Sequence, residues 1–184
     1  MMYQALHYVL SFLLQVASFL FLARFILQAC RVDFYNPVSQ GVVKVTDPVL
    51  RPIRLMLPGY RNLDFAALAV ALVCQIALLM AVSAMEGGYT GGIVLILVAG
   101  LLQVAMLAIQ IFWFAITIGI IASWIAPGNY HPALQLLHQI SEPLLAPARR
   151  LLPAMGGLDL SPIIVFLVLG LLQKMLPAIV MSFF

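Results

Sequence analysis

Charged side chains are scarce in this sequence, and their scarcity excludes an ordinary soluble domain. Nine Lys and Arg and six Asp and Glu make up only 8% of the 184 residues, whereas soluble domains carry about 25%. Hydrophobic residues account for 65% of the chain, and the mean hydropathy is +1.14. A chain of this composition needs an apolar solvent, so we expect an integral membrane protein.

Cysteine and catalytic motifs are also scarce. Cys30 and Cys74 have neither the spacing of a redox pair nor that of a zinc site. The chain has no P-loop, no nucleophile elbow, no zincin helix and no paired-carboxylate pocket. His131, His138 and Glu142 share a helical face, but the other half of the chain has no matching ligand set. We therefore expect a protein that is not an enzyme and has no cofactor and no metal.

Four long segments lack charge and predict membrane-spanning helices. A bilayer core of roughly 30 Å needs about 20 helical residues, and alternating barrel strands are absent. The expected spans are 4–24, 65–85, 96–124 and 161–180. The apolar run 93–125 would reach about 50 Å as one helix, so it must tilt, break or overhang.

The distribution of charge predicts the orientation of the chain. Twelve of the 15 charged residues lie in 31–64 and 142–159, whereas the connection at 86–92 has no basic residue. By the positive-inside rule both charged stretches are cytoplasmic. We expect a multi-pass membrane protein with both termini and the connection at 86–92 on the outer side. The net charge of +3 reflects the orientation of the chain in the membrane, so we expect no nucleic acid partner.

The chain is an internal duplication at a spacing of 95 residues. From position 37 to 64, ten of 28 residues are identical to the residue 95 positions later, including four prolines. The predicted units are 1–85 and 96–184, joined by a Gly-rich connection at 86–95. Each unit crosses twice, so both repeats must have the same orientation. The expected fold is all-α, with four transmembrane helices in two tandem parallel repeats.

The middle segment of each repeat, 36–62 and 131–158, predicts a helix lying in the membrane plane. Val38, Val42, Val45 and Val49 follow helical spacing opposite polar residues. Asn36 before Pro37 is a good N-cap, and Asp47 before Pro48 repeats that signal. We expect Pro52 and Pro58, with Pro147 and Pro153 in the second repeat, to stop regular helix.

At these residues the chain resembles the YggT (YlmG-related) integral membrane proteins over nearly its whole length. The resemblance rests on a motif that occurs once in each half of the chain. Its candidate structural residues are Asn36, Pro37, Asp47, Pro48, Pro52, Pro58 and Asp64 in the first half, and Glu142, Pro143, Pro147, Pro153 and Asp159 in the second. The resemblance implies a bacterial inner-membrane protein. It also implies links to osmotic or potassium stress tolerance, to cell division and, in plastid relatives, to membrane or cytochrome assembly.

Four arginines are candidate contacts for lipid or a partner protein: Arg51, Arg54, Arg149 and Arg150. Arg54 and Arg149 each lie ten residues before an Asp that precedes a predicted span. Such an arginine can bind a lipid phosphate, or pair with Asp64 or Asp159 and hold the in-plane helix against the bundle. The simpler alternative is a positive-inside anchor beside an N-capping Asp.

Three glutamines, Gln15, Gln75 and Gln110, form a candidate polar layer near the middle of the membrane. Counted from the charged ends at 1.5 Å per residue, Gln15 and Gln75 lie at a similar depth, about 15 Å. The amides can join helices by hydrogen bonds or line a hydrated ion path.

These features support two hypotheses. The first is a non-enzymatic scaffold, or assembly and stress-tolerance factor, whose basic cytoplasmic segments bind membrane lipids or a protein partner. The alternative is a small transporter, channel or transport accessory for potassium or another osmotic solute. Four helices enclose little volume, so a pore would require a homo-oligomer.

Overall fold

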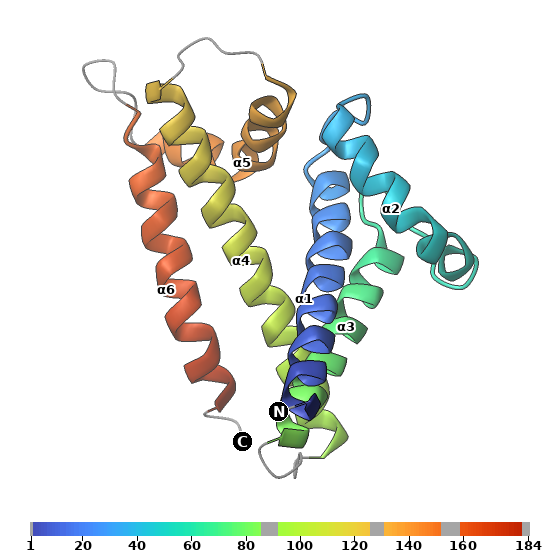
Figure 1. Cartoon of the computed structure of the whole chain (residues 1–184). Helices are drawn as coiled ribbons and strands as arrows, with labels where there is room; N and C mark the ends of the chain where they lie inside the picture. Colours follow the sequence, from blue (N-terminus) through green and yellow to red (C-terminus); the bar gives the residue numbers. More distant parts are fainter. Residues whose placement is uncertain (1, 86–91, 126–130, 152–158, 182–184) are drawn as a thin grey trace.

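The computed structural model describes residues 2–85, 92–125, 131–151 and 159–181, and these ranges form six helices (Figure 1). The helices are α1 (Met2–Ala29), α2 (Pro37–Arg54), α3 (Phe65–Met85), α4 (Ile93–Ile125), α5 (Pro132–Leu151) and α6 (Ser161–Met181). The order long, short, long occurs twice, as the duplication predicts. Pro153 and most of the Gly-rich connection lie outside the described residues.

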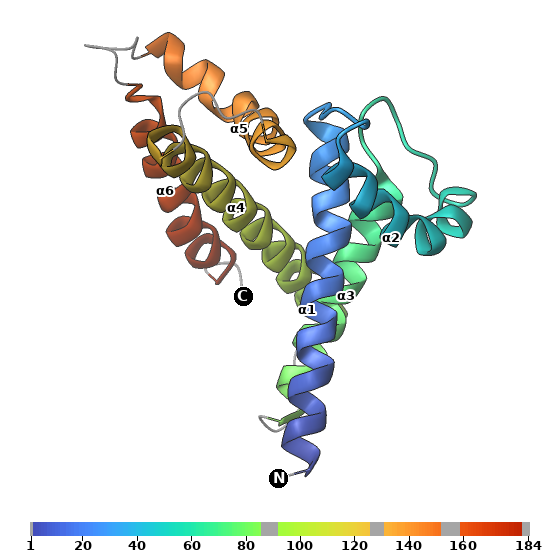
Figure 2. The same ribbon diagram turned by 45° about the horizontal axis from the view of Figure 1, so that its top comes forward.

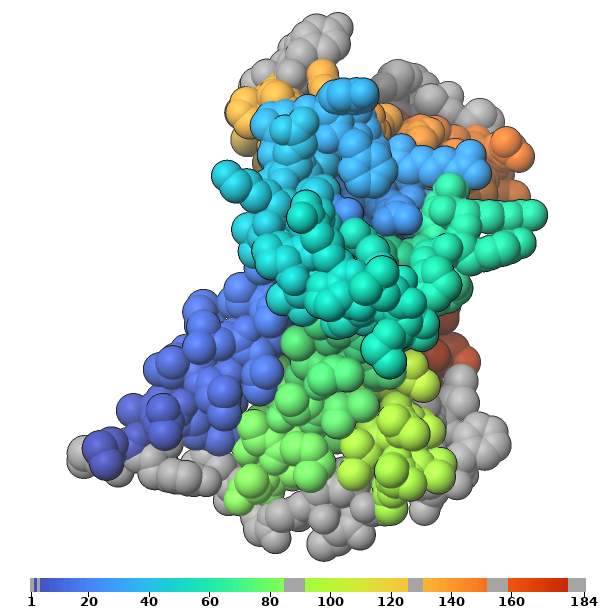
Figure 3. Space-filling view, turned by 90° about the vertical axis from the view of Figure 1, so that its right-hand side faces the viewer, coloured from blue at the N-terminus to red at the C-terminus, as the bar shows by residue number. Residues whose placement is uncertain are grey.

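Four of the helices, α1, α3, α4 and α6, are long and apolar enough to cross a membrane. The multi-pass, all-helical fold with two repeats expected from the sequence is therefore found. The two shorter helices, α2 and α5, lie at the same end of the long ones (Figure 1), as two repeats of equal orientation require. In the space-filling view α2 covers that end of α1 and α3 (Figure 3).

The first span is longer than expected from the sequence, because α1 continues past Arg24 to Ala29. The expected end at residue 24 assumed that a charged side chain marks the membrane surface. Arg24 is instead buried and paired with carboxylates. A paired charge can lie inside a spanning helix, because its partners replace the water it loses.

The long apolar run forms one unbroken helix, α4, which is inclined to α1 (Figure 2). Gly100 marks the closest approach of α4 to α3: a Cβ added there would lie 2.5 Å from Cγ1 of Ile76. A small residue at this position lets the two helices pack closely, as is usual between membrane helices. This contact fixes the second repeat against the first.

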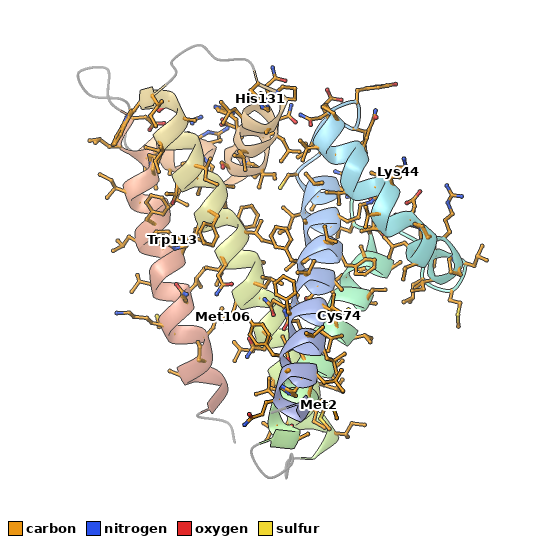
Figure 4. The ribbon with its side chains drawn as sticks, in the orientation of Figure 1. Met2, Lys44, Cys74, Met106, Trp113 and His131 are labelled. Atoms are coloured by element: carbon orange, nitrogen blue, oxygen red, sulfur yellow. The ribbon has the colours of Figure 1, made fainter. Side chains whose placement is uncertain are left out.

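Two clusters of buried apolar side chains hold the helices together. The larger draws on α1 to α5 and includes Leu22, Leu50 and Ala71, so it joins both repeats. The smaller joins α4, α5 and α6 around Ile116 and Val165. Beside it, Trp113 on α4 stacks on Phe166 of α6 with ring centroids 4.3 Å apart (Figure 4). Among the described residues, the buried apolar side chains of α6 belong to the smaller cluster.

Pro52 and Pro147 do not stop the two shorter helices as the sequence predicted, although α2 does end at Arg54, before Pro58. Pro48 and Pro52 lie inside α2, and Pro143 and Pro147 lie inside α5. A proline removes one helical hydrogen bond and frees the carbonyl four residues earlier. All four prolines are exposed, and in each helix the two are four residues apart on one face. The freed carbonyls therefore lie on the outer side, where their cost is smallest.

Three of the four valines predicted to form one face of α2 are exposed, namely Val38, Val45 and Val49. The fourth, Val42, packs against the larger cluster, and the buried residues of α2 are Ser39, Thr46 and Leu50. In α5 the matching face is more enclosed, with Ile140 buried in the larger cluster. The two shorter helices therefore have different surroundings despite their shared pattern.

Candidate functional site

In the first repeat an arginine bridge joins α2 to α3. Arg54, the last residue of α2, donates to Asp64 Oδ2 over 2.5 Å and to Asp47 Oδ1 over 3.3 Å. Asp64 also caps α3, because its Oδ1 accepts the N–H of Ala67 at 3.2 Å. Asp47 lies inside α2 and not at an N-cap, so the second capping signal expected there is wrong. Its carboxylate serves the bridge instead.

The second repeat has the same bridge at positions 95 higher. Arg149 Nε donates to Asp159 at 2.9 Å, and its Nη1 donates to both oxygens of Glu142 at 2.8 and 2.9 Å. Asp159 Oδ1 accepts the N–H of Ser161, the first residue of α6, at 2.9 Å. We call Asp47, Arg54 and Asp64 the first arginine bridge, and Glu142, Arg149 and Asp159 the second arginine bridge.

The two bridges differ in burial. The Asp64 side chain is 2% exposed, whereas that of Asp159 is 40% exposed. A buried carboxylate needs its cation far more than an exposed one does, because little water is left to solvate it. The first arginine bridge is therefore part of the core, and the second lies at the surface.

Hydrogen bonding to the carboxylates shifts the pKa of both bridging arginines. The hydrogen bond to Asp64 raises the pKa of Arg54, and the hydrogen bond to Asp159 raises the pKa of Arg149. Burial by itself would raise the pKa of Asp159, but the hydrogen bonds from Ser161 and Arg149 outweigh it and lower that pKa below its usual value of 3.8. Arg54, Arg149 and Asp159 thus keep their charges at neutral pH.

A second arginine, which sequence reasoning missed, enters the first arginine bridge. Arg24 reaches down from α1, with Nη2 3.5 Å from Asp47 and Nε 4.0 Å from Asp64. It is buried and also lies over the ring of Phe34, 5.9 Å from the centroid. An isolated arginine in an otherwise uncharged apolar helix was the available signal, since such a residue normally has a buried partner.

The four candidate arginines fall into two classes. Arg54 and Arg149 are engaged in the bridges, so their guanidinium groups are mostly occupied by protein carboxylates. Arg51 is 78% exposed and only 3.6 Å from Asp47, and Arg150 is exposed. Lys44, also exposed, lies on the same helix as Arg51 (Figure 4). Arg51, Arg150 and Lys44 are the cations best placed to meet a ligand.

Asn36 joins the two repeats at the start of α2. Its Oδ1 caps the helix by accepting the N–H of Val38 at 2.9 Å, and Pro37 is the first helical residue. Its Nδ2 donates to the carbonyl of Pro132, at the start of α5, at 2.7 Å. Nearby, the N–H of Asp33 donates to Gln139 Oε1 at 3.0 Å. The amino end of α2 is thus docked to α5.

The three predicted glutamines meet in one cleft between α1, α3 and α4. Gln15, Gln75 and Gln110 line a cleft of about 240 Å³, together with Gln103, which sequence reasoning missed. Gln75 is 3% exposed, and within the described ranges its amide has no hydrogen bond to another protein group. The other three amides are exposed on the side of the helices. A polar cleft therefore lies among the membrane-spanning helices.

The described part of the chain holds no cluster of three or more His, Cys, Asp or Glu side chains that could bind a metal ion. His138 Nδ1 lies 3.8 Å from Glu142, and His131 Nδ1 accepts the N–H of Ala133 at the start of α5. Cys30 and Cys74 are half-buried free thiols. Burial raises the pKa of Cys30, which makes its thiolate scarce.

Comparison with known proteins agrees with the duplicated architecture. The family model described as CCB3/YggT matches residues 3–85 and again residues 98–180. An uncharacterized protein of Pseudomonas aeruginosa is 44% identical over 169 residues, covering 91% of this chain and 86% of its own. The YggT protein of Escherichia coli K12 is 38% identical over 168 residues, covering 89% and 85%. No solved structure matches.

Proposed function

The chain belongs to the CCB3/YggT family, and we propose that it is a non-enzymatic scaffold of the bacterial inner membrane. In this proposal α2 and α5 form a rigid platform on the cytoplasmic face, and both termini are periplasmic. The platform carries exposed cations that bind anionic lipid headgroups or an acidic partner protein. A stress-tolerance or assembly role, which the family resemblance implies, would be exerted through that partner.

The observation that carries the proposal is the pair of arginine bridges. Each bridge attaches the end of an in-plane helix to the start of the next span, and both in-plane helices lie at one end of the molecule (Figure 1). The bridges fix the platform, so its exposed cations keep their positions. A preorganised surface loses less entropy on binding than a mobile one.

The exposed valines of α2 support the placement of the platform in the plane of the membrane. Val38, Val45 and Val49 are 42–60% exposed, and on an in-plane helix such a face enters the boundary between headgroups and acyl chains. Lys44 and Arg51 are then near the anionic lipid surface, where each cation adds about 1 kcal/mol of attraction.

The proposal is tested by the neighbours of the protein in its native membrane. Crosslinking and mass spectrometry are applied to wild type, to Arg51→Ala with Arg150→Ala, and to Arg51→Lys with Arg150→Lys. Partners of a basic platform should be lost from the alanine variant and retained by the lysine variant, because lysine keeps the charge. An inventory that is the same for all three proteins would refute the scaffold.

The glutamine cleft supports a second candidate function, passage of potassium or another osmotic solute. Four amides face a cleft among the spanning helices, and amide oxygens can replace part of an ion's hydration shell. Three of these amides are exposed, so a conducting path would be completed by a second copy of the chain.

Proteoliposomes separate this candidate from the scaffold. Wild type should then pass potassium down a gradient, and Gln15→Leu with Gln110→Leu should stop the flux. Gln173→Leu, on α6 and outside the residues that line the cleft, is the matched control and should leave it unchanged. If wild-type liposomes stay tight under every gradient, the transport function is excluded.

A further inference from the structure

A wide groove opens in the second repeat where the first repeat is closed. The groove, of about 1230 Å³, lies between the end of α4, the middle of α5 and the start of α6. Its walls are mostly apolar, with Ile116, Ile120, Leu145, Ile163 and Phe166 among them, and Arg149 and Asp159 line its polar part. This volume exceeds the roughly 300–1,000 Å³ of sites for drug-sized ligands.

The matching positions of the first repeat form a packed core. Leu22 and Ile26, which lie 95 residues before Thr117 and Ile121 of the groove, are 1% and 4% exposed, whereas Ile121 is 47% exposed. The largest difference is at position 24. In the first repeat the side chain of Arg24 fills the space that corresponds to the groove. Its counterpart in the groove is Gly119, and a Cβ added at Gly119 would meet nothing within 4 Å. The groove is therefore the place that a long cationic side chain occupies in the other half.

The carboxylates of the second arginine bridge, of which Asp159 lines the groove, have fewer cations than their counterparts. Asp47 and Asp64 are within 4.0 Å of three arginines, Arg24, Arg51 and Arg54. Glu142 and Asp159 have one, Arg149, because the residues matching Arg24 and Arg51 are Gly119 and Ala146.

Among the described residues, His138 is the other titratable side chain within 4.0 Å of this acidic pair, with its Nδ1 3.8 Å from Glu142. His138 is on α5, lines the groove and has a side chain that is 69% exposed. Glu142 and Asp159 thus share one arginine, and the place that matches Arg24 is open space beside Gly119 of α4.

We propose that the groove binds an aminophospholipid, with the primary ammonium of its headgroup at Asp159. The ammonium takes the place that the Arg24 guanidinium has in the first repeat, and an acyl chain lies along the apolar walls. A primary ammonium has three N–H donors for this carboxylate, whereas a choline headgroup has none. An apolar groove with an acid in its polar part fits an amphiphile better than a soluble cation, because burial of the acyl chain adds to the charge pairing.

The groove contains its own reporter, Trp124, which lines it and is 74% exposed. The chain has two tryptophans, so Trp113→Phe leaves Trp124 as the single indole. This variant is reconstituted in choline-lipid bilayers that contain equal fractions of brominated-chain phosphatidylethanolamine or brominated-chain phosphatidylcholine. We expect the ethanolamine lipid to quench Trp124 with an apparent affinity about tenfold higher, as charge-assisted hydrogen bonding gives.

Two variants test where the headgroup is held. Gly119→Arg supplies an internal guanidinium and should bring the ratio of the two affinities to about one, because it replaces the ammonium. Gly119→Ala adds a methyl group to open space and should keep the preference. A series of mono-, di- and trimethylated ethanolamine lipids needs no further variant, and the preference should fall as donors are lost.

Three outcomes would overturn the proposal. Equal quenching by both brominated lipids would show that the groove does not recognise the headgroup. A preference that survives Gly119→Arg and complete methylation would place the selectivity elsewhere. An absence of quenching by either lipid, with crosslinking of a cysteine at Trp124 to another chain, would show that the groove is an interface with protein.

Discussion

Arg54 and Asp64 are joined by a hydrogen bond of 2.5 Å that connects the last residue of α2 to the residue before α3. The bond closes a turn of ten residues and fixes the angle at which an in-plane helix meets a spanning helix. Its counterpart between Arg149 and Asp159 does the same before α6. The four predictions that follow concern these contacts, the orientation of the chain and the contact between the repeats.

The first prediction is that the two bridges differ in their contribution to stability. Asp64→Asn removes the charge of a side chain that is 2% exposed and leaves Asp47 as the one carboxylate shared by Arg24 and Arg54. We expect a loss of about 3 kcal/mol in the free energy of unfolding. Asp159→Asn should cost less than about 1 kcal/mol, because water solvates that site. Equilibrium unfolding in mixed micelles, followed by far-UV circular dichroism, measures both; equal losses would contradict the assignment of core and surface.

The second prediction concerns acid. The pKa of Asp159 is lower in the folded chain than its usual value of 3.8. At pH values between the folded and the unfolded pKa, the folded state therefore binds fewer protons than the unfolded state. The stability contributed by Asp159 is therefore complete above the unfolded pKa and is lost as pH falls through the folded pKa. The difference in stability between wild type and Asp159→Asn should shrink over this acidic range. A difference that is constant with pH would argue against the ion pair.

The third prediction is the orientation of the platform. In a chain with Cys30→Ala and Cys74→Ala, single cysteines are placed at the exposed positions Arg51, Arg150 and Gln4. A membrane-impermeant maleimide added to spheroplasts should label only position 4, because the basic segments face the cytoplasm. Inverted vesicles should give the reverse pattern, with 51 and 150 labelled. Labelling of position 51 from outside would reverse the topology.

The fourth prediction concerns the closest contact between α3 and α4. Gly100→Leu places a side chain where even a Cβ would be 2.5 Å from Ile76, so the helices must separate. We expect a loss of about 1–3 kcal/mol in the free energy of unfolding. The matched control is Gly170→Leu on α6, where a Cβ meets nothing within 4 Å. If the control loses as much stability as Gly100→Leu, the close approach is not what holds the repeats together.

The sequence predicts the spans and the symmetry of this fold because both depend on simple counting. Uncharged runs of about 20 residues mark the spans, and the spacing of 95 residues places Arg54 with Arg149 and Asp64 with Asp159. The pairing of each arginine with an aspartate was one of the alternatives open at the sequence level. The structure adds that each aspartate also caps a helix, so two of those alternatives hold together.

The sequence does not predict where tertiary contacts change a local preference. Pro48 and Pro52 remain inside α2 because their freed carbonyls lie on an exposed face. Arg24 remains inside α1 because carboxylates from two other helices meet it. Gln103 lines the cleft because of the way α4 is rotated about its own axis. The sequence of α4 is apolar on all sides, so it does not indicate which face of the helix points to the cleft. Each of these depends on a partner distant in the sequence.

The packing of α6 determines the order in which the helices would leave the membrane under a pulling force. Its buried residues belong only to the smaller cluster with α4 and α5, whereas α1 to α5 share the larger one. A molecule drawn out of a bilayer by its carboxyl end should release α6 first, break the second arginine bridge next, and leave the first repeat still inserted. The resistance of the helices to extraction should therefore be highest for the amino-terminal hairpin and lowest for α6.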